Sequence, residues 1–134
     1  TAAEESLRFA AGGAVGRMAT APTEIRGCPI AAGTMVFAGG PASNRDPAHV
    51  EHPHVFDVGR TRSRLFTFGA GDHFCLGASL ARLTLEIALA TCATMIPTVR
   101  LAVGIDDVEW QSTAGPPVVV SLPVTIGDKG KGAW

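Results

Sequence analysis

The chain has 134 residues, a formal net charge of -1 and a sequence pI near 6.4. This charge balance offers nothing for nucleic acid or an anionic membrane to bind, and no apolar run approaches the roughly 20 residues that span a bilayer. Charged residues make up 17% of the chain, against about 25% in an ordinary soluble domain. We therefore expect the chain to be part of a larger protein or assembly, with no nucleic acid and no membrane as partner.

Residues 1–11 form the first predicted helix. Thr1 can cap the helix, and Glu4 and Glu5 lie in its first turns, where carboxylates favour the positive end of the helix dipole. The glycine pair at residues 12–13 predicts its end.

Short strands are predicted after this helix. Residues 15–20 form one candidate strand, and EIRGCPIAAGTMVFAG indicates a hairpin of residues 24–26 with residues 34–38. Residues 44–64 show no sustained periodicity and are either a long ordered loop or disordered. Loops of this length in compact domains are usually functional.

The strongest helical pattern runs from Leu76 to about Met95 and is closed by Pro97. Its apolar positions recur at helical spacing and include Leu76, Leu80, Leu83, Ile87 and Ala90. After it, VRLAV, VEW and PPVVVSLPVTI predict short strands broken by prolines. The final residues, GDKGKGAW at 127–134, are predicted to be a disordered tail.

The three cysteines do not suggest a disulfide framework. Cys28, Cys75 and Cys92 are odd in number and widely spaced. No C-x-x-C pair is present, so the sequence gives no sign of a zinc site. This cysteine usage favours a reducing, cytoplasmic location.

One cysteine ends a glycine-rich loop, FTFGAGDHFCLG at residues 66–77, just before the strongest helix. At that place, free backbone N–H groups and the helix dipole favour thiolate over thiol. Such a thiolate suits a nucleophile, a redox thiol or a metal ligand. No resolving cysteine is close, and His73 is too near in sequence for good base geometry. A thiolate flanked by Phe68 and Phe74 best fits an axial ligand of haem iron, and the alternative is a cysteine packed as a small hydrophobe.

This loop resembles the cysteine loop of the cytochrome P450 family, the haem-thiolate monooxygenases. The family pattern F-x-x-G-x-x-x-C-x-G is met by Phe68, Gly71, Cys75 and Gly77. Other stretches resemble bacterial members in the same order: EESLRF resembles the E-x-x-R of the K helix, and SNRDP and FDVGR resemble the meander. LAR and SLPVTI follow the cysteine in the family order, so the resemblance covers residues 3 to about 126.

The resemblance implies an α+β fold that is mainly helical with small antiparallel β-sheets. Residues 1–134 would be the C-terminal segment of a single cytochrome P450 domain. That segment contains the K helix, the meander, the cysteine loop, the L helix and the C-terminal strands.

The resemblance also assigns roles to individual residues. Cys75 matches the axial thiolate, and Glu5, Arg8 and Arg60 match a buried ion network behind the haem. An arginine suits this role because its planar guanidinium can bind a carboxylate through two hydrogen bonds. Taken alone, Glu5 and Arg8 are an ordinary helix pair at i, i+3. The residues expected to contact haem are Cys75, His73, Arg17, Phe68, Gly69, Gly71 and Gly77, with His73 and Arg17 on the propionates and Phe68 near the sulfur.

The function implied is insertion of one oxygen atom of O2 into a small organic substrate, with haem b as the cofactor. A small acidic ferredoxin would deliver electrons, steered by Arg62 and Arg64 beside the inward Arg60. Family members are much longer, and their oxygen-activating distal helix has no counterpart here. We therefore expect activity to require a missing N-terminal portion or a second chain. The alternatives are a haem sensor, or a truncated P450-like module with a structural or interaction role and no oxygenase activity.

Overall fold

A computed structural model describes residues 1–10, 12–61, 64–112 and 117–127. The predicted tail lies almost wholly outside the described residues, as does Arg62. Contacts between Cα atoms divide the chain into two compact units, Thr1–Ala78 and Ser79–Trp134. The prediction of a single domain stays a prediction.

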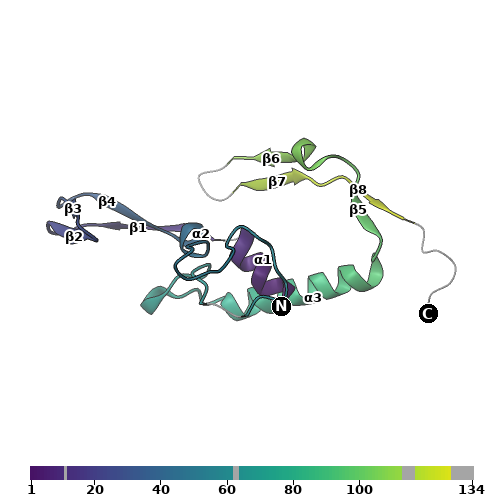
Figure 1. Cartoon of the computed structure of the whole chain (residues 1–134), viewed down its shortest axis with the longest axis horizontal. Helices are drawn as coiled ribbons and strands as arrows, with labels where there is room; N and C mark the ends of the chain where they lie inside the picture. Colours follow the sequence, from purple (N-terminus) through teal and green to yellow (C-terminus); the bar gives the residue numbers. More distant parts are fainter. Residues whose placement is uncertain (11, 62–63, 113–116, 128–134) are drawn as a thin grey trace. The chain divides into compact units, whose positions relative to one another are not determined.

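The first unit is built around a short amphipathic helix followed by paired strands (Figure 1). Its elements are α1 (Ala2–Ala10), β1 (Ala14–Met18), β2 (Thr23–Ile25), β3 (Cys28–Ile30), β4 (Met35–Gly39), α2 (Gly40–Ser43) and the 3-10 turn η1 (Gly71–His73). The helix starts as predicted, because the Glu4 backbone N–H donates to Thr1 Oγ1 at 3.4 Å. Gly12 follows α1 with a φ of +123°, a conformation that glycine adopts without strain.

The predicted hairpin of residues 24–26 with 34–38 is wrong in its pairing. Strand β2 pairs with β3 through a two-residue turn, and β4 pairs antiparallel with β1. Arg26 and Gly27 form that turn with φ values of 48° and 79°. Two left-handed residues match the twist of a hairpin, but arginine is not a usual signal for that geometry. The result is one hairpin carried at the end of another (Figure 1).

Turns without strands fill the described part of the segment from Asn44 to Cys75, apart from η1. Of the two alternatives for residues 44–64, an ordered loop is what the structure describes outside residues 62–63. The side chains buried in this unit lie mainly on α1 and in this loop: Ala3, Glu5, Leu7, Arg8, Asn44, Val50 and Ala78. Charged and polar groups therefore form much of the interior, and each of them needs a bonding partner there.

The second unit contains the long helix and the C-terminal strands. Its elements are α3 (Ala78–Met95), which starts at the boundary between the units, β5 (Val99–Leu101), η2 (Ile105–Asp107), β6 (Glu109–Gln111), β7 (Val118–Ser121) and β8 (Val124–Ile126). Strand β5 pairs with β8 and β6 pairs with β7, both antiparallel. The short strands predicted after Pro97 are thus confirmed, and they form two-stranded sheets.

Helix α3 exposes most of its apolar positions. Leu80 is 67% exposed and Ile87 is 57% exposed. Among the described residues, α3 is long and apolar enough by length and composition to cross a membrane. A single helix of this kind is weak evidence for a span, because the core helix of a soluble protein passes the same test.

Candidate functional site

Glu5 and Arg8 form a buried, two-bonded ion pair on α1. Arg8 Nη2 donates to Glu5 Oε1 and Arg8 Nε donates to Glu5 Oε2, both at 2.8 Å. The two side chains are 3% and 1% exposed. The i, i+3 spacing places both on one face of the helix, and the paired geometry is the strongest that an arginine and a carboxylate make. This pair therefore differs from an ordinary exposed helix pair in being buried and in having two hydrogen bonds.

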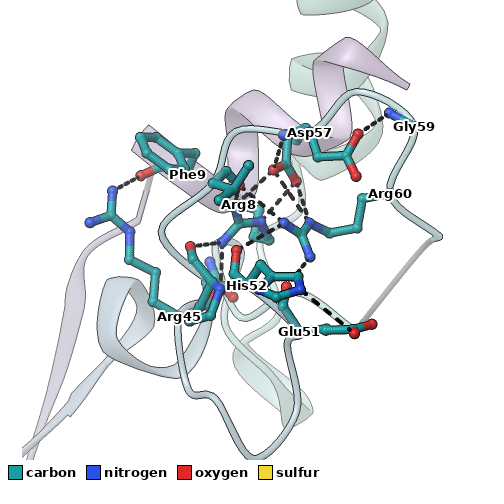
Figure 2. Close-up of polar contacts among 12 residues, drawn as sticks. Arg8, Phe9, Arg45, Glu51, His52, Asp57, Gly59 and Arg60 are labelled. Carbon is teal, nitrogen blue, oxygen red and sulfur yellow. Dashed lines mark hydrogen bonds and ion pairs between the residues drawn. The ribbon is translucent and has the colours of Figure 1, made fainter.

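Arg60 joins the same carboxylate from the other end of the long loop. Its Nε lies 3.3 Å from Glu5 Oε2 and 3.4 Å from Oε1. The Asp57 backbone N–H also donates to Glu5 Oε1, at 2.8 Å. The structure thus brings together the three residues expected to form an ion network, and it adds a backbone donor that the sequence did not indicate (Figure 2).

The two guanidinium groups bind backbone carbonyls of the loop. Arg8 donates to the carbonyls of Asn44, Pro53 and Val55 at 3.2, 2.8 and 3.0 Å. Arg60 donates to the carbonyls of Glu51, His52 and Val55. A loop without strands leaves its carbonyls unpaired, and these charged donors satisfy them. The ion network therefore fixes the path of the loop as well as neutralising Glu5.

This environment lowers the pKa of Glu5. The hydrogen bonds from Arg8 are the largest cause, and with the Asp57 N–H and Arg60 they outweigh burial and bring the pKa from 4.5 to about 2. The same partnership raises the pKa of Arg8. Both shifts favour the charged forms, so the pair stays ionised throughout the physiological range.

The shift predicts how stability depends on pH. Because the folded-state pKa of Glu5 is depressed, its contribution is fully present above pH 4.5 and is lost as pH falls toward 2. Urea midpoints measured across this window should fall with pH. In Glu5→Gln the midpoint should be lower at neutral pH and should change less across the window. An equal pH slope in Glu5→Gln and the parent protein would contradict the assignment.

The cysteine loop is closed by backbone hydrogen bonds. The Cys75 N–H donates to the Phe68 carbonyl and the Gly69 N–H donates to the Phe66 carbonyl, both at 3.0 Å. Gly69 and Gly71 both have a φ of +76°, which a residue with a Cβ would adopt only with strain. These two glycines are therefore required by the path of the loop itself.

Cys75 lies before the helix, in an exposed position. Helix α3 begins at Ala78, two residues later than the Leu76 predicted, and the Ala78 N–H donates to the Cys75 carbonyl at 3.2 Å. Gly77 lies beside the sulfur: a Cβ placed on it would be 4.0 Å from Cys75 Sγ, an ordinary van der Waals contact. The rings of Phe68 and Phe74 meet edge to face at 6.4 Å between centroids.

A groove of about 340 Å³ lies in the first unit, between the β1–β4 hairpin and the cysteine loop. Arg17 and His73 both line it, together with Phe66 and Gly69. The two basic residues expected to bind propionates therefore reach one groove, although they are 56 positions apart in the sequence. Most of the lining surface is apolar, which suits a flat macrocycle, and the two basic side chains suit its anionic arms. Cys75 is not among the residues that line this groove.

Two polar residues of this region received no role from the sequence. Asn44 is 1% exposed, and its Nδ2 donates to Thr67 Oγ1 at 2.8 Å. Asn44 occurs in the SNRDP stretch, which resembles the family meander. The contact with Thr67 spans 23 positions of irregular chain, a distance at which no periodicity of the sequence can predict contact.

Comparison with known proteins gives one consistent result. The family model described as Cytochrome P450 matches residues 2–94. The chain is 41% identical over 128 residues to nocardicin C N-oxygenase of Nocardia uniformis subsp. tsuyamanensis, covering 93% of this chain and 32% of that protein. It is 38% identical to the polyketide biosynthesis cytochrome P450 PksS of Bacillus subtilis, covering 94% and 32%.

Solved structures agree with the sequence relatives. The structure of PksS superposes with a TM-score of 0.87 at 36% identity, covering 95% of this chain and 34% of that chain. LnmA, a hydroxylase of Streptomyces atroolivaceus S-140, superposes with a TM-score of 0.81 at 36% identity, covering 92% and 32%. The chain spans about a third of the length of these relatives. Its helices and small antiparallel sheets match the C-terminal part of their fold, and the chain belongs to the cytochrome P450 family.

Proposed function

We propose that this chain is the haem-binding C-terminal part of a haem-thiolate monooxygenase, with Cys75 as the axial ligand of the iron. The observation that carries the proposal is the cysteine loop. Its backbone is closed at Phe68 and Cys75, and its sulfur is exposed beside a glycine. The hydrogen bonds and glycines of this loop hold the thiolate at one place, and its exposed sulfur stays accessible to a large planar group.

The groove residues complete the proposed haem site. Arg17 and His73 supply hydrogen-bond donors for the two propionates, and Gly69 and Gly71 let the backbone approach the macrocycle. Phe68 places an aromatic ring on the loop that holds the sulfur, and Gly77 lies next to the Cys75 sulfur. We propose haem b, the cofactor that the family resemblance implies.

The ion network has a supporting role in this proposal. Arg8 and Arg60 fix the path of the loop from Asn44 to Asp57 through its carbonyls, and Glu5 accepts from the Asp57 backbone N–H. That loop precedes the cysteine loop in the chain. Holding it rigid preserves the position of the groups that meet the haem, which matters because an axial ligand must keep its geometry through turnover.

A thiolate-ligated haem supplies the activation of O2, from which one oxygen atom is inserted into an organic substrate. The relatives include 6-deoxyerythronolide B hydroxylase and nocardicin C N-oxygenase, as their names state. We propose a small organic substrate of this biosynthetic kind and a cytoplasmic location. Because the chain spans about a third of such relatives, the activity is proposed for the whole protein, including an N-terminal portion or a second chain.

The absorption spectrum of the reduced, carbon-monoxide-bound protein tests this proposal. A thiolate ligand gives the complex a red-shifted main band, which a neutral nitrogen or oxygen ligand does not give. We expect the red-shifted band in the haem-loaded protein at neutral pH. A carbon monoxide complex with only the unshifted band would contradict haem-thiolate ligation.

An acidic ferredoxin is the proposed electron donor, docking beside Arg62 and Arg64. Arg64 is exposed, with its guanidinium 5.5 Å from the Phe66 ring centroid, and Arg62 lies outside the described residues. Charge complementarity mainly raises the association rate. Changing both arginines to glutamate should therefore slow electron transfer at low salt, measured by stopped-flow reduction. The defect should shrink as salt rises, because screening shortens to about 8 Å near physiological ionic strength.

The matched control is the pair Arg26→Glu and Arg100→Glu, which changes the net charge equally at two exposed positions elsewhere. This control should reduce at nearly the parent rate. Equal slowing in both double variants would show a general charge effect and place the docking surface elsewhere.

A further inference from the structure

Asn44 is a fully buried amide at the end of α2, with its side chain bonded on both sides. Its Oδ1 accepts from the Phe66 backbone N–H at 2.7 Å, and its Nδ2 donates to Thr67 Oγ1 at 2.8 Å. A backbone N–H can only donate, so the orientation of the amide is determined by its partners. Asn44 therefore holds residues 66 and 67 with both ends of its side chain.

Thr67 and the Asn44 backbone continue these contacts to α1. The Thr67 hydroxyl donates to the Leu7 carbonyl at 2.8 Å. The Asn44 carbonyl accepts from Arg8 Nη1 at 3.2 Å. One buried residue thus contacts both the ion network through its backbone and the start of the cysteine loop through its side chain.

The cysteine loop is built directly on the segment that Asn44 holds. The Phe66 carbonyl accepts from the Gly69 N–H, and the Phe68 carbonyl accepts from the Cys75 N–H. A shift of the backbone at residues 66–67 would therefore be passed to Cys75 through only two backbone hydrogen bonds. No water is expected to replace the amide, because the side chain is 1% exposed.

We propose that Asn44 is a positioning residue for the Cys75 thiolate, linking the Glu5–Arg8–Arg60 network to the cysteine loop. This role rests on the proposed haem-thiolate function. The hydrogen bonds of Asn44 that would carry it all lie within this chain. In this arrangement Thr67 is the partner that orients the Asn44 amide. Asn44 contacts none of the groups that would react, so its effect on the iron is indirect.

Amide hydrogen exchange measured by NMR on the protein tests the link without using activity. Asn44→Ala removes the acceptor of the Phe66 N–H and should speed its exchange at least about tenfold. Thr67→Val should also speed it, although Thr67 does not contact that N–H, because the Asn44 amide loses its orienting partner. Added to Asn44→Ala, Thr67→Val should cause no further change at Phe66. Thr67→Ser keeps a hydroxyl and should restore the parent rate.

Thr94→Val is the matched control, since the Thr94 hydroxyl also donates to a backbone carbonyl, that of Ala90 at 2.8 Å. It should leave Phe66 and Cys75 exchange unchanged. Should Asn44→Ala fail to fold, Thr67→Val alone still tests the link. The proposal is overturned if Thr67→Val leaves Phe66 unaffected, or speeds the β1–β4 amides as much as Phe66.

The haem spectrum separates this inference from the proposed function. In Thr67→Val we expect a smaller fraction of the carbon monoxide complex with the red-shifted band, restored in Thr67→Ser. Absence of that band in the parent protein would contradict haem-thiolate function. The exchange result would then still show whether Asn44 links Thr67 to the Phe66 N–H. A full red-shifted band in Thr67→Val and in Asn44→Ala would overturn the positioning role.

Discussion

Replacing Cys75 by serine is expected to abolish the red-shifted band of the reduced, carbon-monoxide-bound protein. A serine hydroxyl has nearly the same size as a thiol but is a far weaker donor to iron than a thiolate. Its neutral form dominates at any working pH, so it cannot supply the anionic sulfur that haem-thiolate ligation needs. We expect the band to be lost completely, with any remaining haem absorbing at the unshifted position.

Cys28→Ser and Cys92→Ser are close controls for this prediction. All three cysteines are free and exposed, so a serine at any of them causes a similar change of surface. Cys28 lies on β3 and Cys92 on α3, outside the glycine loop. Both variants should keep the red-shifted band. Loss of the band in either of them, with retention in Cys75→Ser, would show that the ligand is misassigned.

Arg8→Ala is expected to destabilise the protein by roughly 3–5 kcal/mol, the cost of leaving a buried charge without its main partner. The Glu5 carboxylate, 3% exposed, would lose both of its shortest side-chain bonds. The carbonyls of Asn44 and Pro53 would lose a charged donor as well. Against the 5–15 kcal/mol total of a typical domain, this loss should give little soluble, haem-loaded protein. Urea unfolding and the haem content of the soluble fraction measure both effects.

Arg100→Ala is the comparison variant, because Arg100 is exposed and donates a hydrogen bond to the neighbouring Val99 carbonyl at 2.9 Å. It should change the urea midpoint little. Arg8→Lys should lie between the two, since a lysine keeps the charge but cannot bind the carboxylate through two parallel bonds. Parent-like stability and haem content in Arg8→Ala would contradict a structural role for the pair.

Local chemistry explains what the sequence predicted well. The Thr1 cap and the Glu5–Arg8 spacing both act within one turn of α1, and the structure shows both contacts. The cysteine loop was predictable because its glycines sit where the backbone needs a positive φ, at Gly69 and Gly71. In each case the residues that decide the geometry are neighbours in the chain.

Strand pairing and the buried amide depend on residues far apart. Strand β4 pairs with β1, not with the nearer residues 24–26, because Arg26 and Gly27 close a separate turn between β2 and β3. Arginine carries no preference for that left-handed conformation, so the sequence could not indicate the turn. Asn44 likewise contacts Thr67 across 23 positions of irregular chain. Such contacts follow from packing, which composition and periodicity do not describe.

The most direct test of the central claim is the resonance Raman spectrum of the haem-loaded protein with and without ³⁴S-labelled cysteine. The account predicts an iron–sulfur stretching band that moves to lower frequency with the heavier isotope. The band should persist in Cys28→Ser and Cys92→Ser and be absent in Cys75→Ser. A haem-loaded protein without any isotope-sensitive band, or with one that survives in Cys75→Ser, would contradict ligation of the iron by Cys75.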